Sequence, residues 1–204
     1  MRPTAREPAL AAATVPAMGI FASKRERRLW LWTLVVLTAI YATLGLAPML
    51  AEVLRERGWL PAAVACGLVL VGLTIVTQGL QVRPGGVEIA VGLGIAAAYL
   101  LLVARLMAGQ EERTHLMEYG VVGVFVYEAL AERARHGRRV PLPPLIAVLA
   151  TGSLGLLDEG VQAVLPNRVF DPRDLLFNLL AGTTAVGACV ALGWVRRRAG
   201  GRPE

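Results

Sequence analysis

Apolar residues gather in six long segments separated by short polar stretches. Each segment is close to the roughly 20 residues that a helix needs to cross a hydrocarbon core about 30 Å thick. The fourth segment is the shortest and has polar residues at both ends. The pattern predicts an all-α protein, a polytopic bundle of about six transmembrane helices, over residues 29–50, 60–80, 86–107, 114–131, 143–165 and 172–195.

Composition supports this class. Of the 204 residues, 55% are hydrophobic and 18% are charged, whereas soluble domains usually carry about 25% charged residues. The net charge of +6 does not indicate nucleic-acid binding, because the basic residues flank apolar segments and form no continuous stripe. We expect an integral, multi-pass protein of a cell membrane whose partner is the lipid bilayer.

The basic residues predict an orientation. If the N-terminus is cytoplasmic, 15 Lys and Arg residues fall inside and six outside, as the positive-inside rule prefers. Both termini are therefore expected in the cytoplasm, and either Met1 or Met18 could start the chain. The expected parts are a flexible cytoplasmic tail, an N-terminal three-helix membrane extension, a second three-helix membrane region and a basic cytoplasmic tail, over residues 1–28, 29–108, 109–196 and 197–204.

Polar side chains occur at helical spacing around the last three apolar segments. His115, Glu118 and Tyr119 share one face of the fourth helix. Asp158 lies about 22 Å along the fifth helix from its expected start. An ionisable group at such depth costs about 2.5–3.5 kcal/mol on insertion scales and usually faces a protein interior or a cavity. The full set of candidate site residues is His115, Glu118, Tyr119, Asp158, Glu159, Gln162, Arg168, Asp171, Asp174 and Asn178.

Each of these residues also has a structural interpretation. Asp171 followed by Pro172 is typical of a helix start, with Asp174 reaching back as in a capping box. Gln162 and Asn178 could form interhelical hydrogen bonds. Arg168 could pair with an acid in a turn, and the remaining groups could be a buried polar network that fixes helix packing.

Three chemical interpretations compete with this structural one. His115, Glu118, Asp158 and Glu159 could supply a general acid or base, because burial raises carboxyl pKa values toward neutrality. The cluster could instead bind an amphiphilic ligand without reacting. A metal site is not expected, because no H-E-x-x-H or Cys/His motif is present. No phosphate-binding or dinucleotide motif occurs, so no cofactor is expected.

At these residues the chain resembles the VanZ-like family of bacterial membrane proteins. One motif is a His followed three and four residues later by an acidic residue and Tyr, in E-R-T-H-L-M-E-Y over residues 112–119. The second is the series G-x-x-D-E-x-x-Q, P-x-R and D-x-x-x-N within residues 155–178. The resemblance covers about residues 110–195, and the helices before Arg105 do not show it clearly.

The resemblance implies a protein of the bacterial cell envelope, in the inner or plasma membrane, with its polar cluster at the outer face. It also implies a link to low-level resistance to the glycopeptide teicoplanin. The expected function is binding of an amphiphilic or glycopeptide-related ligand at this cluster. The alternative is an intramembrane enzyme that acts on a lipid-linked or cell-wall precursor, with a buried carboxylate as acid or base. The sequence leaves open whether the cluster is catalytic, which ligand it takes and how the chain oligomerises.

Overall fold

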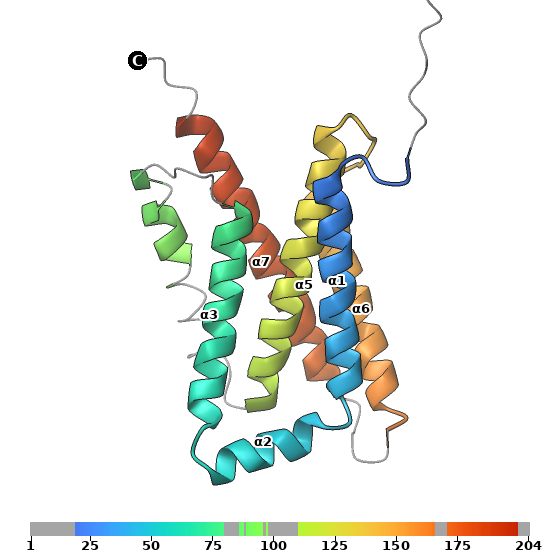
Figure 1. Ribbon diagram of the computed structural model, residues 1–204, viewed down its shortest axis with the longest axis vertical. Helices are drawn as coiled ribbons and strands as arrows, with labels where there is room; N and C mark the ends of the chain where they lie inside the picture. Colours follow the sequence, from blue (N-terminus) through green and yellow to red (C-terminus); the bar gives the residue numbers. More distant parts are fainter. Residues whose placement is uncertain are drawn as a thin grey trace, which may run out of the picture.

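The computed structural model shows a bundle of helices and no strand in the part of the chain that it describes (Figure 1). The described residues are 19–79, 86, 87, 89–95, 97, 110–165 and 171–199. The named helices are α1 (Lys24–Thr43), α2 (Ala47–Glu56), α3 (Leu60–Gly79), α5 (Gln110–Arg135), α6 (Pro143–Gln162) and α7 (Pro172–Ala199).

The first predicted span, residues 29–50, is wrong in its boundaries. Helix α1 begins at Lys24 and ends at Thr43, and the chain then turns into the separate short helix α2. The physical reason is Pro48, which has no N–H to donate to the carbonyl of Leu44 and so cannot continue the first helix. Residues 24–28 are helical, so the tail boundary expected at residue 28 does not match the structure.

The last three predicted helices are found with shifted ends. The fourth, expected over 114–131, is the 26-residue α5, about 39 Å long at 1.5 Å per residue. The fifth ends at Gln162 instead of 165, and the sixth begins at Pro172 as predicted but continues to Ala199. Most of the third predicted helix, 86–107, lies outside the described residues.

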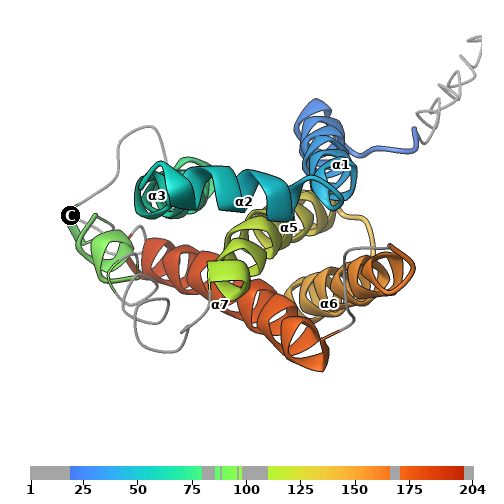
Figure 2. The same cartoon turned by 90° about the horizontal axis from the view of Figure 1, so that it is seen from below.

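Helix α5 is the centre of the bundle. It packs against α1, α3, α6 and α7, and Figure 2 shows these helices around it in a view along the bundle. Its buried residues Leu116, Val122 and Val126 are each at most 1% exposed and belong to two apolar clusters. The apolar faces of the outer helices remain exposed, as for Leu149 at 58%.

Small residues bring α5, α6 and α7 close together. A Cβ atom on Gly123 of α5 would lie 3.2 Å from the Cα atom of Gly182 in α7. A Cβ atom on Gly182 would lie 3.0 Å from a side-chain carbon of Thr151 in α6. Close helix contacts at small residues are the usual packing device of membrane helices. This contact fixes the three helices on which the candidate site lies.

Two of the described helices, α6 and α7, are long and apolar enough to cross a membrane, and α2 with α3 would make a third if that bent pair is one span. These helices support a membrane protein.

The two ends of the bundle differ in charge. We call the end where α2 lies the α2 end, and the end where α1 begins and α7 ends the terminal end (Figure 1). Among the residues whose side chains the structure describes, the terminal end carries Lys24, Arg25, Arg27, Arg28, Arg133, Arg135, Arg138, Arg139, Arg196, Arg197 and Arg198, and the α2 end carries Arg55, Arg57 and Arg173.

Candidate functional site

Two tyrosines from different helices meet at one backbone carbonyl near the α2 end. The hydroxyl of Tyr41 in α1 donates to the Leu154 carbonyl of α6 at 3.1 Å, and the hydroxyl of Tyr119 in α5 donates to the same oxygen at 3.3 Å. Tyr119 is fully buried. Tyr41 was not among the residues predicted from the sequence. An aromatic hydroxyl within an apolar helix was the available signal, because such a group needs a partner when it is buried.

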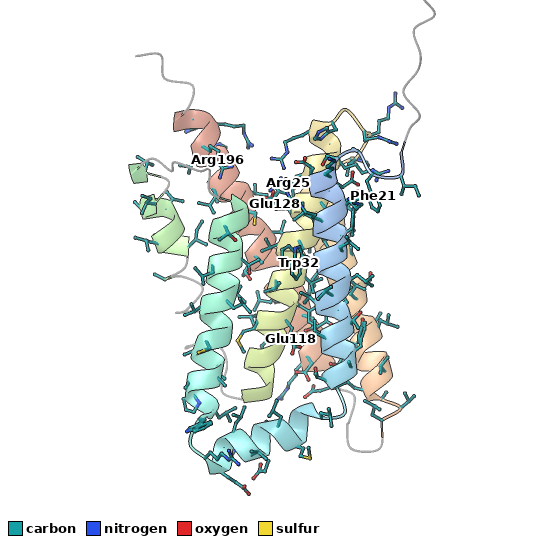
Figure 3. The ribbon with its side chains drawn as sticks, in the orientation of Figure 1. Phe21, Arg25, Trp32, Glu118, Glu128 and Arg196 are labelled. Atoms are coloured by element: carbon teal, nitrogen blue, oxygen red, sulfur yellow. The ribbon has the colours of Figure 1, made fainter. Side chains whose placement is uncertain are left out.

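Asp158 lies one turn beyond Leu154 on α6 and is fully buried. Its carboxyl group interacts with the hydroxyl of Tyr119 and electrostatically with Tyr41. Glu118, which is partly buried, also interacts with Tyr119, and Figure 3 shows it on the lower part of α5. The structure therefore brings side chains of α1, α5 and α6 together around a buried carboxylate.

Asn178 of α7 is an unusual polar group at this end. It is fully buried, and neither its carbonyl oxygen nor its amide nitrogen has a hydrogen-bond partner. Its side chain lies against Gly155 of α6, where an added Cβ atom would be 2.6 Å from the Asn178 Cβ and 2.8 Å from its Nδ2. The interhelical hydrogen bond that the structural interpretation gave to Asn178 is not formed. Only a glycine at position 155 leaves room for this amide.

Glu159 has a structural role in the connection between α6 and α7. It is fully buried. Its Oε2 accepts from the backbone N–H of Asp171 at 3.2 Å, and its Oε1 accepts from the Gln162 side chain at 3.5 Å. Gln162 therefore bonds to its own helix, not across to another one as the structural interpretation had it. A carboxylate occupied in this way anchors the start of α7.

The predicted helix start at Asp171 is confirmed. The Asp171 carboxylate accepts from the backbone N–H of Arg173 at 2.8 Å, and Pro172 is the first helical residue. Asp174, whose backbone N–H donates to the Asp171 carbonyl at 3.0 Å, lies in the first turn. The exposed position of Asp171 agrees with a capping role.

Two predicted site residues are outside what the structure describes. His115 lies in the second turn of α5, but its side chain is outside the described residues, as is the whole of Arg168. We call the described group the tyrosine–carboxylate cluster, and it consists of Tyr41, Tyr119, Asp158, Glu159, Gln162 and Asn178.

A second polar group, which sequence reasoning missed, lies at the terminal end. The guanidinium of Arg25 donates to Glu132 at 3.0 Å and to Glu128 at 2.9 Å. Arg133 donates to the fully buried Glu26 at 2.8 Å. Figure 3 shows Arg25 and Glu128 close together at the upper end of α1 and α5. We call this group the arginine–glutamate clamp, and it consists of Ser23, Arg25, Glu26, Glu128, Glu132, Arg133 and Arg135.

The clamp begins with a helix cap. The Ser23 hydroxyl accepts from the backbone N–H of Glu26 at 3.0 Å and donates to Glu132 at 2.9 Å. The S-x-x-E spacing of Ser23 and Glu26 is a capping-box signal, so this part could have been found in the sequence. Burial alone would lower the pKa of Arg25, but hydrogen bonds and ion pairs with Glu132 and Glu128 raise it above its ordinary value.

The two polar groups have different chemical capacities. Every clamp carboxylate has a hydrogen bond from a cation or hydroxyl, so the clamp joins α1 to α5. The tyrosine–carboxylate cluster combines two buried carboxylates, two phenols and an unsatisfied amide, which can bind hydroxyl, amide or ammonium groups. Within the described residues, no group of three His, Cys, Asp or Glu side chains is arranged to hold a metal ion.

Comparison of the chain with models of known families, with curated proteins and with solved structures gives no significant match.

Proposed function

We propose that this chain is a six-span, VanZ-like protein of the bacterial cell membrane, with both termini in the cytoplasm. In this proposal the tyrosine–carboxylate cluster faces the outer side and binds a polar group of an amphiphilic envelope ligand. The concentration of basic residues at the terminal end supports the orientation, because basic residues accumulate on the cytoplasmic side. The VanZ-like motifs supply most of the cluster, including Tyr119, Asp158 and Asn178.

One observation carries the binding proposal, namely the unsatisfied Asn178 amide. A buried polar group without a hydrogen bond costs about 1–3 kcal/mol, and native structures contain few such groups. A ligand hydroxyl or amide that reached Asn178 would remove this penalty on binding. The Asp158 carboxylate, three residues along α6 from the Gly155 that Asn178 contacts, would accept a second hydrogen bond or an ammonium group from the same ligand.

The intramembrane-enzyme alternative rests on a narrower basis. A carboxylate beside a phenol, as at Asp158 and Tyr119, is an arrangement that can transfer protons. Glu159 is a weaker candidate than the sequence indicated, because its two oxygens already accept from Asp171 and Gln162. The alternative therefore depends on Asp158 and on the histidine at position 115.

The test is complementation of a deletion strain, with teicoplanin susceptibility as the readout. Asp158→Asn keeps the shape of the side chain and removes its charge, and Asn178→Ala removes the amide. Both variants should lose the phenotype of the wild-type gene while a tagged form remains at the wild-type level in the membrane. Glu56→Gln is the matched control, because it removes an exposed charge at the same end of the bundle and should complement fully.

Full complementation by both Asp158→Asn and Asn178→Ala would refute the binding proposal. Loss with Asp158→Asn but not with Asn178→Ala would favour the enzyme, because proton transfer requires the carboxyl group and not the amide. If deletion itself leaves teicoplanin susceptibility unchanged, the glycopeptide part of the proposal fails.

A further inference from the structure

We propose that α2 is an interfacial helix, which lies in the boundary between lipid headgroups and acyl chains at the α2 end of the bundle. It has ten residues, so it is about 15 Å long and far too short to cross a membrane. It is bent by 120° from α3. Figure 1 shows it lying across the lower end of the bundle, and Figure 2 shows it extending from α3 toward the end of α1.

The turn that ends α2 is specified by the sequence. Gly58 has a φ of 69°, in the left-handed region that glycine adopts without strain. Its N–H donates to the Arg55 carbonyl at 3.0 Å, and the N–H of Trp59 donates to the Leu54 carbonyl at 2.8 Å. This pattern is a helix-terminating motif. The bend between α2 and α3 is therefore determined by the local sequence at Gly58.

The two faces of α2 are chemically opposite. Met49, Leu50 and Val53 lie within one 100° sector of the helix, and they are 64%, 56% and 38% exposed. On the other side Glu52 forms an ion pair with Arg55. Among the described helices, α2 packs mainly against α3, and the exposure of these three side chains shows that the apolar face is not covered by protein. Such a helix is stable with one face in acyl chains and the other among polar headgroups.

The residues that follow α2 identify lipid as the partner. The Trp59 ring is 61% exposed, and the Arg57 guanidinium carbon lies 5.9 Å from the ring centroid. Exposed tryptophan is enriched at membrane–water interfaces, and arginine binds phosphate through charged hydrogen bonds. A tryptophan and an arginine at the end of an amphipathic helix fit a phospholipid interface better than a second copy of the chain.

This placement sets the depth of the tyrosine–carboxylate cluster, without depending on what the cluster binds. Helix α2 begins four residues after α1 ends at Thr43. Tyr41 is in the last turn of α1, and it contacts the Leu154 carbonyl. If α2 marks the headgroup plane, the cluster lies just beneath that plane, where the polar part of an amphiphile from the same leaflet would reach it.

The test uses fluorescence of the full-length chain in phosphatidylcholine vesicles. A single-tryptophan variant keeps Trp59 and replaces Trp30, Trp32 and Trp194 by Phe. Lipids brominated near the headgroup should quench Trp59 more strongly than lipids brominated deep in the acyl chains. The matched variant keeps Trp32, which is exposed on α1 (Figure 3), and should show the reverse order.

Each alternative gives a distinct result that would overturn the proposal. Deep bromines quenching Trp59 best would indicate that α2 and α3 form a re-entrant span. Quenching by aqueous iodide with no effect of brominated lipid would place α2 in water. Resistance to both quenchers, with emission that changes with the protein-to-lipid ratio, would indicate a second copy of the chain.

A second measurement avoids the tryptophan substitutions. Val53→Cys, in a background of Cys66→Ser and Cys189→Ala, carries a spin label on the apolar face of α2. The label should be more accessible to membrane-dissolved oxygen than to an aqueous nickel complex. Adding Leu50→Glu on the same face should reverse this preference, whereas adding Arg55→Gln on the opposite face, which changes the net charge by the same amount, should leave it unchanged. A label more accessible to nickel without these additions would contradict the proposal.

Discussion

The arginine–glutamate clamp and the tyrosine–carboxylate cluster are both largely buried polar groups, but they differ in how far their side chains are hydrogen-bonded. In the clamp, opposite charges from α1 and α5 meet at hydrogen-bond distance, as between Arg133 and Glu26. In the cluster, the Asn178 amide has no hydrogen bond at all. Buried polar groups with hydrogen-bond partners stabilise a fold, whereas buried polar groups without partners lower its stability. The difference separates a structural device from a candidate binding site.

The largest effect is expected at the clamp. Glu26→Ala removes a fully buried carboxylate and leaves Arg133, which is about two-thirds buried, without its partner. Breaking a buried pair in this way costs about 3 kcal/mol, so the thermal midpoint in detergent should fall by several degrees. The control is Glu52→Ala, which breaks an exposed pair with Arg55 and should cost less than about 1 kcal/mol. Equal midpoints for the two variants would mean that the clamp does not stabilise the fold.

The cluster should respond to added volume at Gly155. The Cβ atom of Gly155→Ala would lie 2.6 Å from the Asn178 Cβ, so α6 and α7 must separate or the amide must move. Overpacking of this kind costs about 1–3 kcal/mol, and thermal unfolding in detergent measures it. Gly160→Ala on the same helix meets no atom within 4 Å, so it should be neutral or stabilise slightly through helix propensity. Equal destabilisation by both would show that the Gly155 contact is unimportant.

Removing the polar group from the cluster should have little effect on stability. Asn178→Ala removes an unsatisfied amide, which should stabilise the fold by about 1–3 kcal/mol. The same substitution also removes packing contacts, which should destabilise the fold by a similar amount. We expect a free energy of unfolding within about 1 kcal/mol of the wild type, together with loss of function in the complementation assay. Destabilisation as large as that of Glu26→Ala would show that Asn178 has a structural bond like those of the clamp.

Much of the helical architecture could be predicted from the sequence. The apolar segments predicted α6 and α7 to within a few residues, because long apolar runs at a membrane length have few other solutions. The start of α7 at Pro172 followed from its Asp-Pro dipeptide. Pro48 marks this break in the sequence, but the apolar run around it predicts a single span over residues 29–50. Hydropathy predicts one continuous helix there, whereas the missing N–H of proline predicts a break, and the structure has the break.

The sequence predicted which polar residues lie within the helices better than it predicted which side chains they contact. Helical spacing placed Tyr119, Asp158 and Asn178 among the candidate site residues, but spacing within one helix does not predict which side chains of another helix lie opposite. Tyr41 and Glu128 come from elements whose contacts depend on how α1 packs on α5. Glu159 illustrates the limit, because only the path of the chain between α6 and α7 brings the Asp171 amide to its carboxylate.

The smallest effect is the pH dependence of the clamp. Burial alone would raise the pKa of Glu132, but hydrogen bonds from Ser23 and Arg25 and the charge of Arg135 hold it below the usual value of 4.5. A depressed pKa in the folded state gives stability that is present above the unfolded value and is lost as the pH falls through the folded one.

Stability should therefore be unchanged between pH 7 and pH 5 and should decline below about pH 4.5. The loss of folding free energy from Glu132 should stay under about 1 kcal/mol, because Arg25 and Arg135 are 32% and 54% exposed and solvent screens their charges. Glu132→Gln should flatten the acid decline measured by thermal unfolding, while Glu52→Gln should not. A decline of the same size in Glu132→Gln would assign the acid sensitivity to other carboxylates and would leave the clamp as a fixed structural contact.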